Sequence, residues 1–106
     1  RFVKIEIREV NKFVYEGCDY KIYLDEGGEE MNSKEFSKFL NNLMMHHKKI
    51  CFFIGSWEGI DEEEKKKADF ILSLSKMTFP YQLCRIILLE QIYRAITLIK
   101  GIAYHK

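Results

Sequence analysis

The segment that most restricts the fold is a short run, residues 50–54, in which every side chain is apolar (Ile-Cys-Phe-Phe-Ile). Successive side chains of a strand point to opposite faces of a sheet, so a run without polar residues indicates a strand that is covered on both faces. Gly55 follows directly and ends the run. Other elements must therefore lie on both sides of this strand, as they do in α/β proteins with parallel sheets.

Three further segments have the pattern of strands. Residues 3–8 alternate apolar and charged side chains (Val-Lys-Ile-Glu-Ile-Arg), which predicts a strand with one solvated face. Residues 20–24 (Tyr-Lys-Ile-Tyr-Leu) repeat this pattern and lead into Asp-Glu-Gly-Gly at 25–28, where the paired glycines predict a turn. Residues 70–74 form a further short strand (Phe-Ile-Leu-Ser-Leu).

Segments with helical spacing separate these strands. Either Asn32 or Ser33 can cap an amphipathic helix, and Asp61 can cap a polar helical turn over residues 62–68. Pro80 suits the start of a long helix over residues 81–100, and Gly101 suits its end. The apolar face of the first helix consists of Phe36, Phe39, Leu40, Leu43 and Met44.

This alternation predicts an α/β sheet with mainly parallel pairing. Ligands of such sheets bind outside the carboxyl ends of the strands, where three loops are expected here, over residues 25–28, 55–59 and 75–79. A chain of 106 residues is expected to form one domain, residues 1–106. The loop at 55–59 is a Gly-x-x-x-Gly without the Lys and Ser or Thr of a phosphate-binding loop, which argues against nucleoside triphosphate hydrolysis.

The long final helix is apolar around most of its circumference, which exceeds the stripe of roughly 100° on an ordinary surface helix. One face can pack on the sheet, and the surplus predicts a homodimer. The alternative is a core that buries the whole helix within one chain. The apolar positions are Leu83, Cys84, Ile86, Ile87, Leu88, Leu89, Ile92, Tyr93, Ala95, Ile96, Leu98 and Ile99.

Charge and cysteine content limit the expected partners, although a local basic patch could still bind nucleic acid. Seventeen Lys and Arg against 16 Asp and Glu give a net charge of +1, too little to attract bare nucleic acid or an anionic membrane by a global field. Three cysteines without a Cys-x-x-Cys motif predict a reducing, cytoplasmic compartment.

No apolar run is long enough for a membrane helix, so no membrane partner is expected. His46 and His47 are adjacent and lack the spacing of metal ligands, so no metal is expected.

The carboxyl-terminal part of the chain carries a long and specific motif. Residues 74–80 read Leu-Ser-Lys-Met-Thr-Phe-Pro, and Glu-Gln-Ile-Tyr-Arg-Ala and Gly-Ile-Ala-Tyr-His-Lys follow at 90–95 and 101–106. Over residues 20–106 the chain resembles the bacterial large-subunit ribosomal RNA pseudouridine N3-methyltransferases of the SPOUT superfamily. The other matching residues are Arg85, Leu24-Asp25, Ser33-x-Glu35-Phe36 and Ile54-Gly55-x-x-x-Gly59.

The resemblance implies a SPOUT-type sheet with a carboxyl-terminal trefoil knot, and an obligate homodimer packed through the last helix. It implies an S-adenosylmethionine-dependent enzyme that methylates N3 of a pseudouridine in 23S ribosomal RNA of the assembled ribosome. The family begins with a further strand and helix ahead of the segment equivalent to residues 1–10, and these are expected to be absent here.

The resemblance also assigns site residues. Arg94 is expected to bind the RNA or the uracil carbonyls, His105 to position the substrate or relay a proton, and Tyr104 to act beside it; a frayed terminus is the alternative for the last two. The expected donor-binding residues are Leu24, Gly55, Leu74, Ser75, Lys76, Met77, Thr78 and Phe79.

Two other functions fit parts of the sequence. Ser56 and Trp57 occupy the loop in which the family usually has paired glycines, and Tyr81 replaces the usual His. Ser56, Trp57 and the expected absence of the amino-terminal strand and helix favour the alternative of a non-catalytic knotted dimer that binds RNA or ribosomes. A flavodoxin-like binder of small molecules would share the α/β pattern but would leave the carboxyl-terminal motif unexplained.

Overall fold

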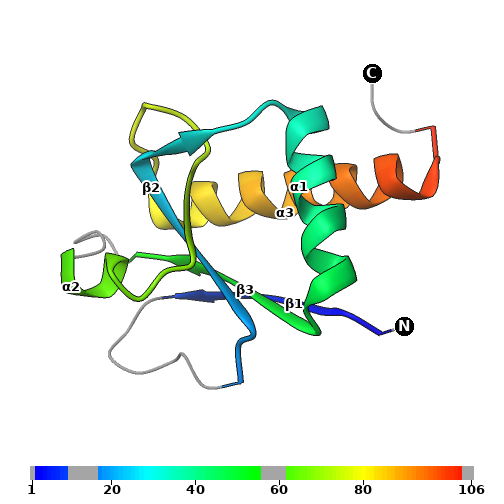
Figure 1. Cartoon of the computed structure of the whole chain (residues 1–106). Coiled ribbons are helices and arrows are strands. Elements are labelled where there is room, and N and C mark those ends of the chain that lie inside the picture. Colours follow the sequence, from blue (N-terminus) through cyan, green and yellow to red (C-terminus); the bar gives the residue numbers. More distant parts are fainter. Residues whose placement is uncertain (1, 10–16, 56–61, 104–106) are drawn as a thin grey trace.

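A computed structural model describes residues 2–9, 17–55 and 62–103, apart from the side chain of Glu64. Within these ranges it contains the strands β1 (Lys4–Glu9), β2 (Tyr20–Glu30), β3 (Lys49–Ile54) and β4 (Phe70–Ser73). The helices are α1 (Ser33–His46), α2 (Glu62–Lys65) and α3 (Tyr81–Lys100), and Figure 1 shows their arrangement.

The four strands form one sheet in the order β1-β3-β2-β4, and every neighbouring pair is parallel. Phe52 in β3 lies opposite Ile7 of β1 on one side and Ile22 of β2 on the other. All five residues from 50 to 54 are buried. The expected central strand in a parallel α/β sheet is therefore confirmed.

The two faces of the sheet carry cores of different size. One face packs against α1 and α3, which cross over it in Figure 1. On the other face, Tyr23, Cys51 and Phe53 form a smaller buried cluster, and the partly buried Cys18 and Ala68 pack against this cluster. Burial raises the pKa of Tyr23 to about 12. The larger core consists of Ile22, Leu24, Phe36, Leu40, Leu43, Ile50, Phe52, Ile54, Leu72, Leu88, Ile92 and Ala95.

Asn32, rather than Ser33, caps α1. Its side-chain oxygen accepts a hydrogen bond from the Glu35 backbone N–H at 2.8 Å, and the Glu35 carboxylate accepts one from the Asn32 backbone N–H at the same distance. This capping box satisfies two donors that the first turn of a helix leaves without partners inside the helix. The first turn of α1 is therefore firmly positioned directly after β2.

The turn predicted at residues 25–28 does not end β2, which continues to Glu30. Leu24 and Glu29 both lie opposite Leu72 of β4, so the intervening residues form an irregularity within the strand. A Cβ atom on Gly28 would lie 2.7 Å from the carbonyl oxygen of Ile71. The glycine is needed because the backbones of β2 and β4 approach closely at this point.

Replacing Gly28 by alanine is expected to lower the free energy of unfolding by about 1–3 kcal/mol, because backbone or core side chains must move to admit the methyl group. Urea denaturation measures the change. Gly27→Ala is the matched control, since its Cβ would meet only the carboxylate end of Asp25, at 3.0 Å, and that side chain can turn away. Equal losses for both variants would contradict the explanation.

Two other expectations are corrected. The polar helix ends at Lys65, not Ala68, whose N–H instead bonds the Lys65 carbonyl in a turn; Asp61, its expected cap, lies outside the described residues. The strand expected over residues 70–74 ends at Ser73. Pro80 is the N-cap of α3, and Gly101 caps its end with φ +72°, as expected.

Two of the cysteines form a disulfide, which corrects the expectation of reduced cysteines drawn from the sequence. Cys18 and Cys51 are bonded, with their Cα atoms 5.9 Å apart, a separation typical of disulfides. Backbone pairing brings them together, because the Asp19 N–H donates to the Lys49 carbonyl at 2.9 Å. The Lys48 and Lys49 N–H groups both donate to the Asp19 carboxylate and hold its pKa below the ordinary value.

Candidate functional site

Three segments meet at the carboxyl edge of the sheet. Leu24 of β2 lies opposite Leu72 of β4, and its neighbour Tyr23 lies opposite Phe53 of β3. Gly55 directly follows β3, so it lies at about the same height along the strands as Leu24. Residues 74–79 leave the end of β4 (Figure 1). The expected donor-binding residues thus come from three parallel strands and lie around one edge, where α/β proteins bind ligands.

These residues offer different groups to a ligand. The Leu24 side chain is buried in the larger core, so what this position can present is its backbone. Gly55 is half-buried, and glycine allows a ligand to approach the backbone closely. In the loop after β4, Lys76, Met77 and Thr78 are exposed, whereas Leu74, Ser75 and Phe79 are half-buried.

Two serines fix the shape of the loop after β4. The Ser73 hydroxyl donates to the Ser75 carbonyl at 2.8 Å, and the Ser75 hydroxyl accepts from the Met77 N–H at 3.0 Å. Side-chain bonds of this kind hold a backbone turn without a strand partner. The backbone around Ser75 and Met77 is therefore preorganised at the edge of the sheet.

An ion pair fixes the neighbouring irregularity of β2. Lys65 Nζ of α2 lies 3.3 Å from Asp25 Oδ1, and the Gly27 N–H donates to Asp25 Oδ2 at 3.0 Å. Burial alone would lower the pKa of Lys65, but its hydrogen bonds to Asp25 and Glu62 outweigh that effect and raise it. Lys65 therefore remains charged at neutral pH and ties α2 to β2.

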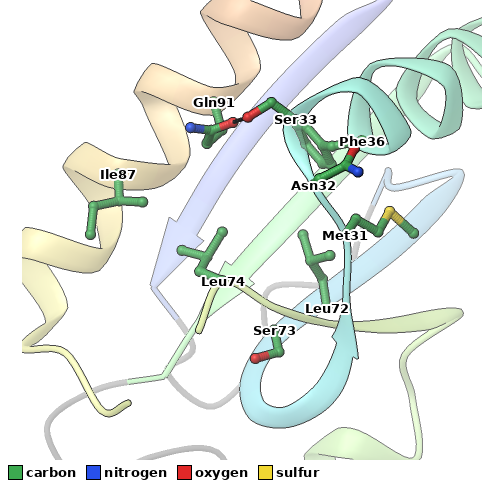
Figure 2. A pocket seen from close by; sticks show the side chains of 9 residues that line it. All are labelled: Met31, Asn32, Ser33, Phe36, Leu72, Ser73, Leu74, Ile87 and Gln91. Atoms are coloured by element: carbon green, nitrogen blue, oxygen red, sulfur yellow. Dashed lines mark hydrogen bonds between the residues drawn. The ribbon is translucent and has the colours of Figure 1, made fainter. Parts of the chain in front are cut away.

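A cavity of about 310 Å³ lies between the start of α1, the end of β4 and the middle of α3 (Figure 2). Its lining combines apolar side chains with the polar ends of Ser33 and Gln91, which approach each other across it in Figure 2. Of the expected donor residues, the cavity includes Leu74. The remaining lining residues are Met31, Asn32, Phe36, Leu72, Ser73 and Ile87.

Arg94 lies on α3, one helical turn beyond Gln91, and its guanidinium is paired with Glu90. The Nη2 atom lies 2.8 Å from Glu90 Oε2, and the two side chains are 23% and 35% exposed. The pair is therefore partly shielded from water. Tyr104 and His105, the other expected catalytic residues, lie outside the described residues.

One side of α3 is apolar and exposed. Leu83, Ile86, Leu89 and Tyr93 are each between 44% and 59% exposed and recur at spacings of three and four residues. The opposite side of the helix is buried in the larger core. The expected surplus of apolar surface on the final helix is thus present in the single chain.

The two adjacent histidines make separate contacts. His46 Nδ1 lies 2.8 Å from the Asn42 carbonyl oxygen, whereas the His47 ring packs on Tyr20 with 4.9 Å between centroids. Within residues 2–9, 17–55 and 62–103, no group of three or more His, Cys, Asp or Glu side chains could hold a metal ion. None of the described helices is both long and apolar enough to cross a membrane.

The sequence model of a family described as "Predicted SPOUT methyltransferase" matches residues 3–105. The chain belongs to this family. The SPOUT resemblance inferred from the carboxyl-terminal motif is therefore confirmed, and the parallel four-stranded sheet agrees with it.

Curated relatives of this SPOUT chain carry the name "Ribosomal RNA large subunit methyltransferase H". The protein of Caldicellulosiruptor bescii is 46% identical over 101 residues, which are 95% of this chain and 65% of the relative. The Clostridium kluyveri protein is 49% identical over 102 residues, which are 95% of this chain and 64% of the relative. The Coprothermobacter proteolyticus protein is 42% identical over 106 residues, or 96% and 75%. The chain thus spans about two thirds of the length of these relatives.

Within the SPOUT chain, sequence reasoning missed most of the cavity. It singled out Asn32 only as a helix cap and Ser33 only as a cap and as part of a matching motif. It gave Ile87 no role beyond the apolar surface of the last helix. Gln91 was noted only as part of the Glu-Gln-Ile-Tyr-Arg-Ala motif. The position of Gln91 directly before the buried Ile92 is a signal that could have identified it, because a half-buried amide needs hydrogen-bond partners.

Proposed function

We propose that this chain is an S-adenosylmethionine-dependent methyltransferase that methylates N3 of a pseudouridine in 23S ribosomal RNA of the assembled ribosome. The observation that carries the proposal is the arrangement of Leu24, Gly55 and residues 74–79 around one edge of the sheet in a SPOUT chain. The names of the relatives support ribosomal RNA as the substrate. The trefoil knot and a cytoplasmic location belong to the same proposal.

The residues at this edge fit the donor. An adenine ring needs apolar contact and hydrogen-bonding groups at its edge. Leu74 offers apolar contact, and the loop fixed by Ser73 and Ser75 offers backbone N–H and C=O groups. We assign donor binding to Leu24, Gly55, Leu74, Ser75, Lys76, Met77, Thr78 and Phe79.

S-adenosylmethionine, when bound, supplies an electrophilic methyl group on a positively charged sulfur. The protein must orient N3 of pseudouridine toward that methyl group and take up the N3 proton. A guanidinium can hold one of the carbonyl groups beside N3 and leave the approach to N3 open, because its planar fork donates several hydrogen bonds. We assign this orienting role to Arg94, and substrate positioning or proton relay to Tyr104 and His105.

We also propose that the working unit is a homodimer in which the apolar side of α3 packs against its copy. Four exposed apolar side chains on one side of a helix form a surface that a two-fold axis can pair with itself. A second copy would cover this surface and complete the cleft.

The test incubates the purified chain with methyl-labelled S-adenosylmethionine and ribosomes that lack the methyl group. We expect label in 23S ribosomal RNA at a single pseudouridine, and transfer to ribosomes but not to free RNA, since the net charge is only +1. Calorimetry with S-adenosylmethionine separates two failures. Donor binding without transfer would contradict the RNA substrate, whereas no donor binding by a folded dimer would favour the non-catalytic alternative.

A further inference from the structure

A continuous series of hydrogen bonds connects the first turn of α1 with Arg94 on α3. The Ser33 hydroxyl donates to Gln91 Oε1 at 2.8 Å, as Figure 2 shows, and Gln91 Nε2 donates to Glu90 Oε1 at 3.0 Å. Glu90 Oε2 then accepts from Arg94 Nη2 at 2.8 Å. Four side chains from two helices are thus joined end to end.

Gln91 suits the middle of this series because an amide carries both an acceptor and a donor. Its oxygen faces the Ser33 hydroxyl, and its NH₂ group faces the Glu90 carboxylate. The reverse orientation would place the amide oxygen against a negatively charged carboxylate. The amide therefore has one favourable orientation, and a glutamate in its place could not donate to Glu90.

The series begins at a firmly held point. Ser33 is the first residue of α1 and lies within the capping box formed by Asn32 and Glu35. The half-buried Ser33 and Gln91 also form part of the wall of the cavity. The hydroxyl of Ser33 is therefore a fixed reference between the start of α1 and the middle of α3.

At its other end, the series holds Glu90 from two directions. Glu90 Oε1 accepts a hydrogen bond from Gln91 Nε2 and lies 3.4 Å from Arg94 Nε. Glu90 Oε2 accepts a hydrogen bond from Arg94 Nη2. An isolated surface pair four residues apart on a helix is weakly ordered, because both side chains are long and solvated. The additional bond from Gln91 restricts Glu90, and Glu90 in turn directs the guanidinium.

We propose that Ser33 and Gln91 are positioning residues that fix Arg94 for the substrate, acting through Glu90. This inference rests on the proposed function, in which Arg94 orients the pseudouridine. Its consequence is that a residue in the cavity wall controls the geometry of the acceptor site, while the donor-binding loop is left unchanged.

The principal test is Gln91→Glu, which keeps the side-chain length and the acceptor for Ser33 but removes the donor to Glu90 and adds a repelling charge. We expect kcat for ribosome methylation to fall by roughly tenfold, since misplacement of an orienting group by about 1 Å can cost up to a hundredfold. The donor Kd should not change. Ser33→Ala should give a smaller loss in the same direction, and it adds no charge that could disturb folding. Asn41→Ala, an amide removed from the exposed face of α1, is the matched control and should keep full activity.

A double variant separates positioning from a structural effect. If Gln91 acts through Arg94, adding Gln91→Glu to Arg94→Ala should lower the remaining rate no further, because coupled residues are not additive. A tenfold loss in both backgrounds would overturn the proposal. Unchanged kcat in both Gln91→Glu and Ser33→Ala, with an active parent protein, would also overturn it.

A readout without catalysis distinguishes this inference from the proposed function. The Nε–H resonance of Arg94, assigned by its loss in Arg94→Lys, should shift and exchange faster in Gln91→Glu and Ser33→Ala but not in Asn41→Ala. If the parent protein transfers no methyl group while this coupling is present, the proposed function fails and the positioning of Arg94 stands. An unperturbed Arg94 resonance in both variants would overturn the positioning itself.

Discussion

Replacing Ile86 by glutamate is expected to turn the proposed dimer into a monomer and to remove methyl transfer. Ile86 is 59% exposed at the centre of the apolar side of α3 formed with Leu83, Leu89 and Tyr93. A two-fold interface contains every substitution twice, so two carboxylates would be buried without partners. We expect the dimer Kd to rise by at least about a thousandfold, which corresponds to roughly 4 kcal/mol. Analytical ultracentrifugation measures the mass, and the ribosome assay measures transfer.

The matched control is Met45→Glu, which adds the same charge at a comparably exposed apolar position on α1. It should remain dimeric and active. A dimeric Ile86→Glu protein would show that another surface forms the interface. A monomer that transfers the methyl group at the full rate would show that each chain contains a complete site.

The second large effect is expected for Arg94→Ala, which should lower the rate of transfer by about 100-fold to 1,000-fold, as loss of a preorganised charged donor does in other active sites. Donor binding should persist, because the guanidinium lies on α3 and not on the loops at the sheet edge. Arg94→Lys should lose less, since it keeps the charge but not the fork that pairs with Glu90. Single-turnover kinetics and donor calorimetry provide the two measurements.

Lys100→Ala is the control for this experiment, because it removes an exposed cation from the same helix. Its rate should equal that of the parent protein. If Arg94→Ala raised the donor Kd and left single-turnover transfer unchanged at saturating donor, the guanidinium would belong to donor binding. The assignment to the acceptor would then be wrong.

Local patterns predicted most of the elements. The apolar run over residues 50–54 predicted the buried central strand, and the spacing from Phe36 to Met44 predicted the buried face of α1. Gly101 predicted the end of α3 because a left-handed cap favours glycine. In each case the decisive forces act within a few residues, so one segment contains enough information.

Contacts between distant segments were not predictable in this way. The strand order places β3 between β1 and β2, and the alternation of strands and helices alone does not determine which strands pair. The continuation of β2 beyond Asp25 depends on the close approach of Gly28 to Ile71, 43 residues along the chain. The disulfide depends likewise on the pairing of β2 with β3.

The candidate site likewise has one part that the sequence predicted and one part that it did not. The family resemblance pointed to the residues proposed to bind the donor, and the register of three strands brings their segments to one edge. The bond between Ser33 and Gln91 spans 58 residues and joins two helices, so no short motif contains both partners. Its detection required the packed positions of α1 and α3.

The strand order also divides the edge of the sheet into a rigid and a compliant part. Gly55 extends from β3, which is paired on both sides and buried on both faces, whereas residues 74–79 extend from the four-residue β4 at the end of the sheet. Segments with more buried contacts open less readily than short strands at the end of a sheet. A ligand at this edge therefore meets a firmly held backbone at Gly55. The loop of residues 74–79 keeps its internal shape but can move as a unit with the end of β4, so closure over the ligand is expected from the β4 side.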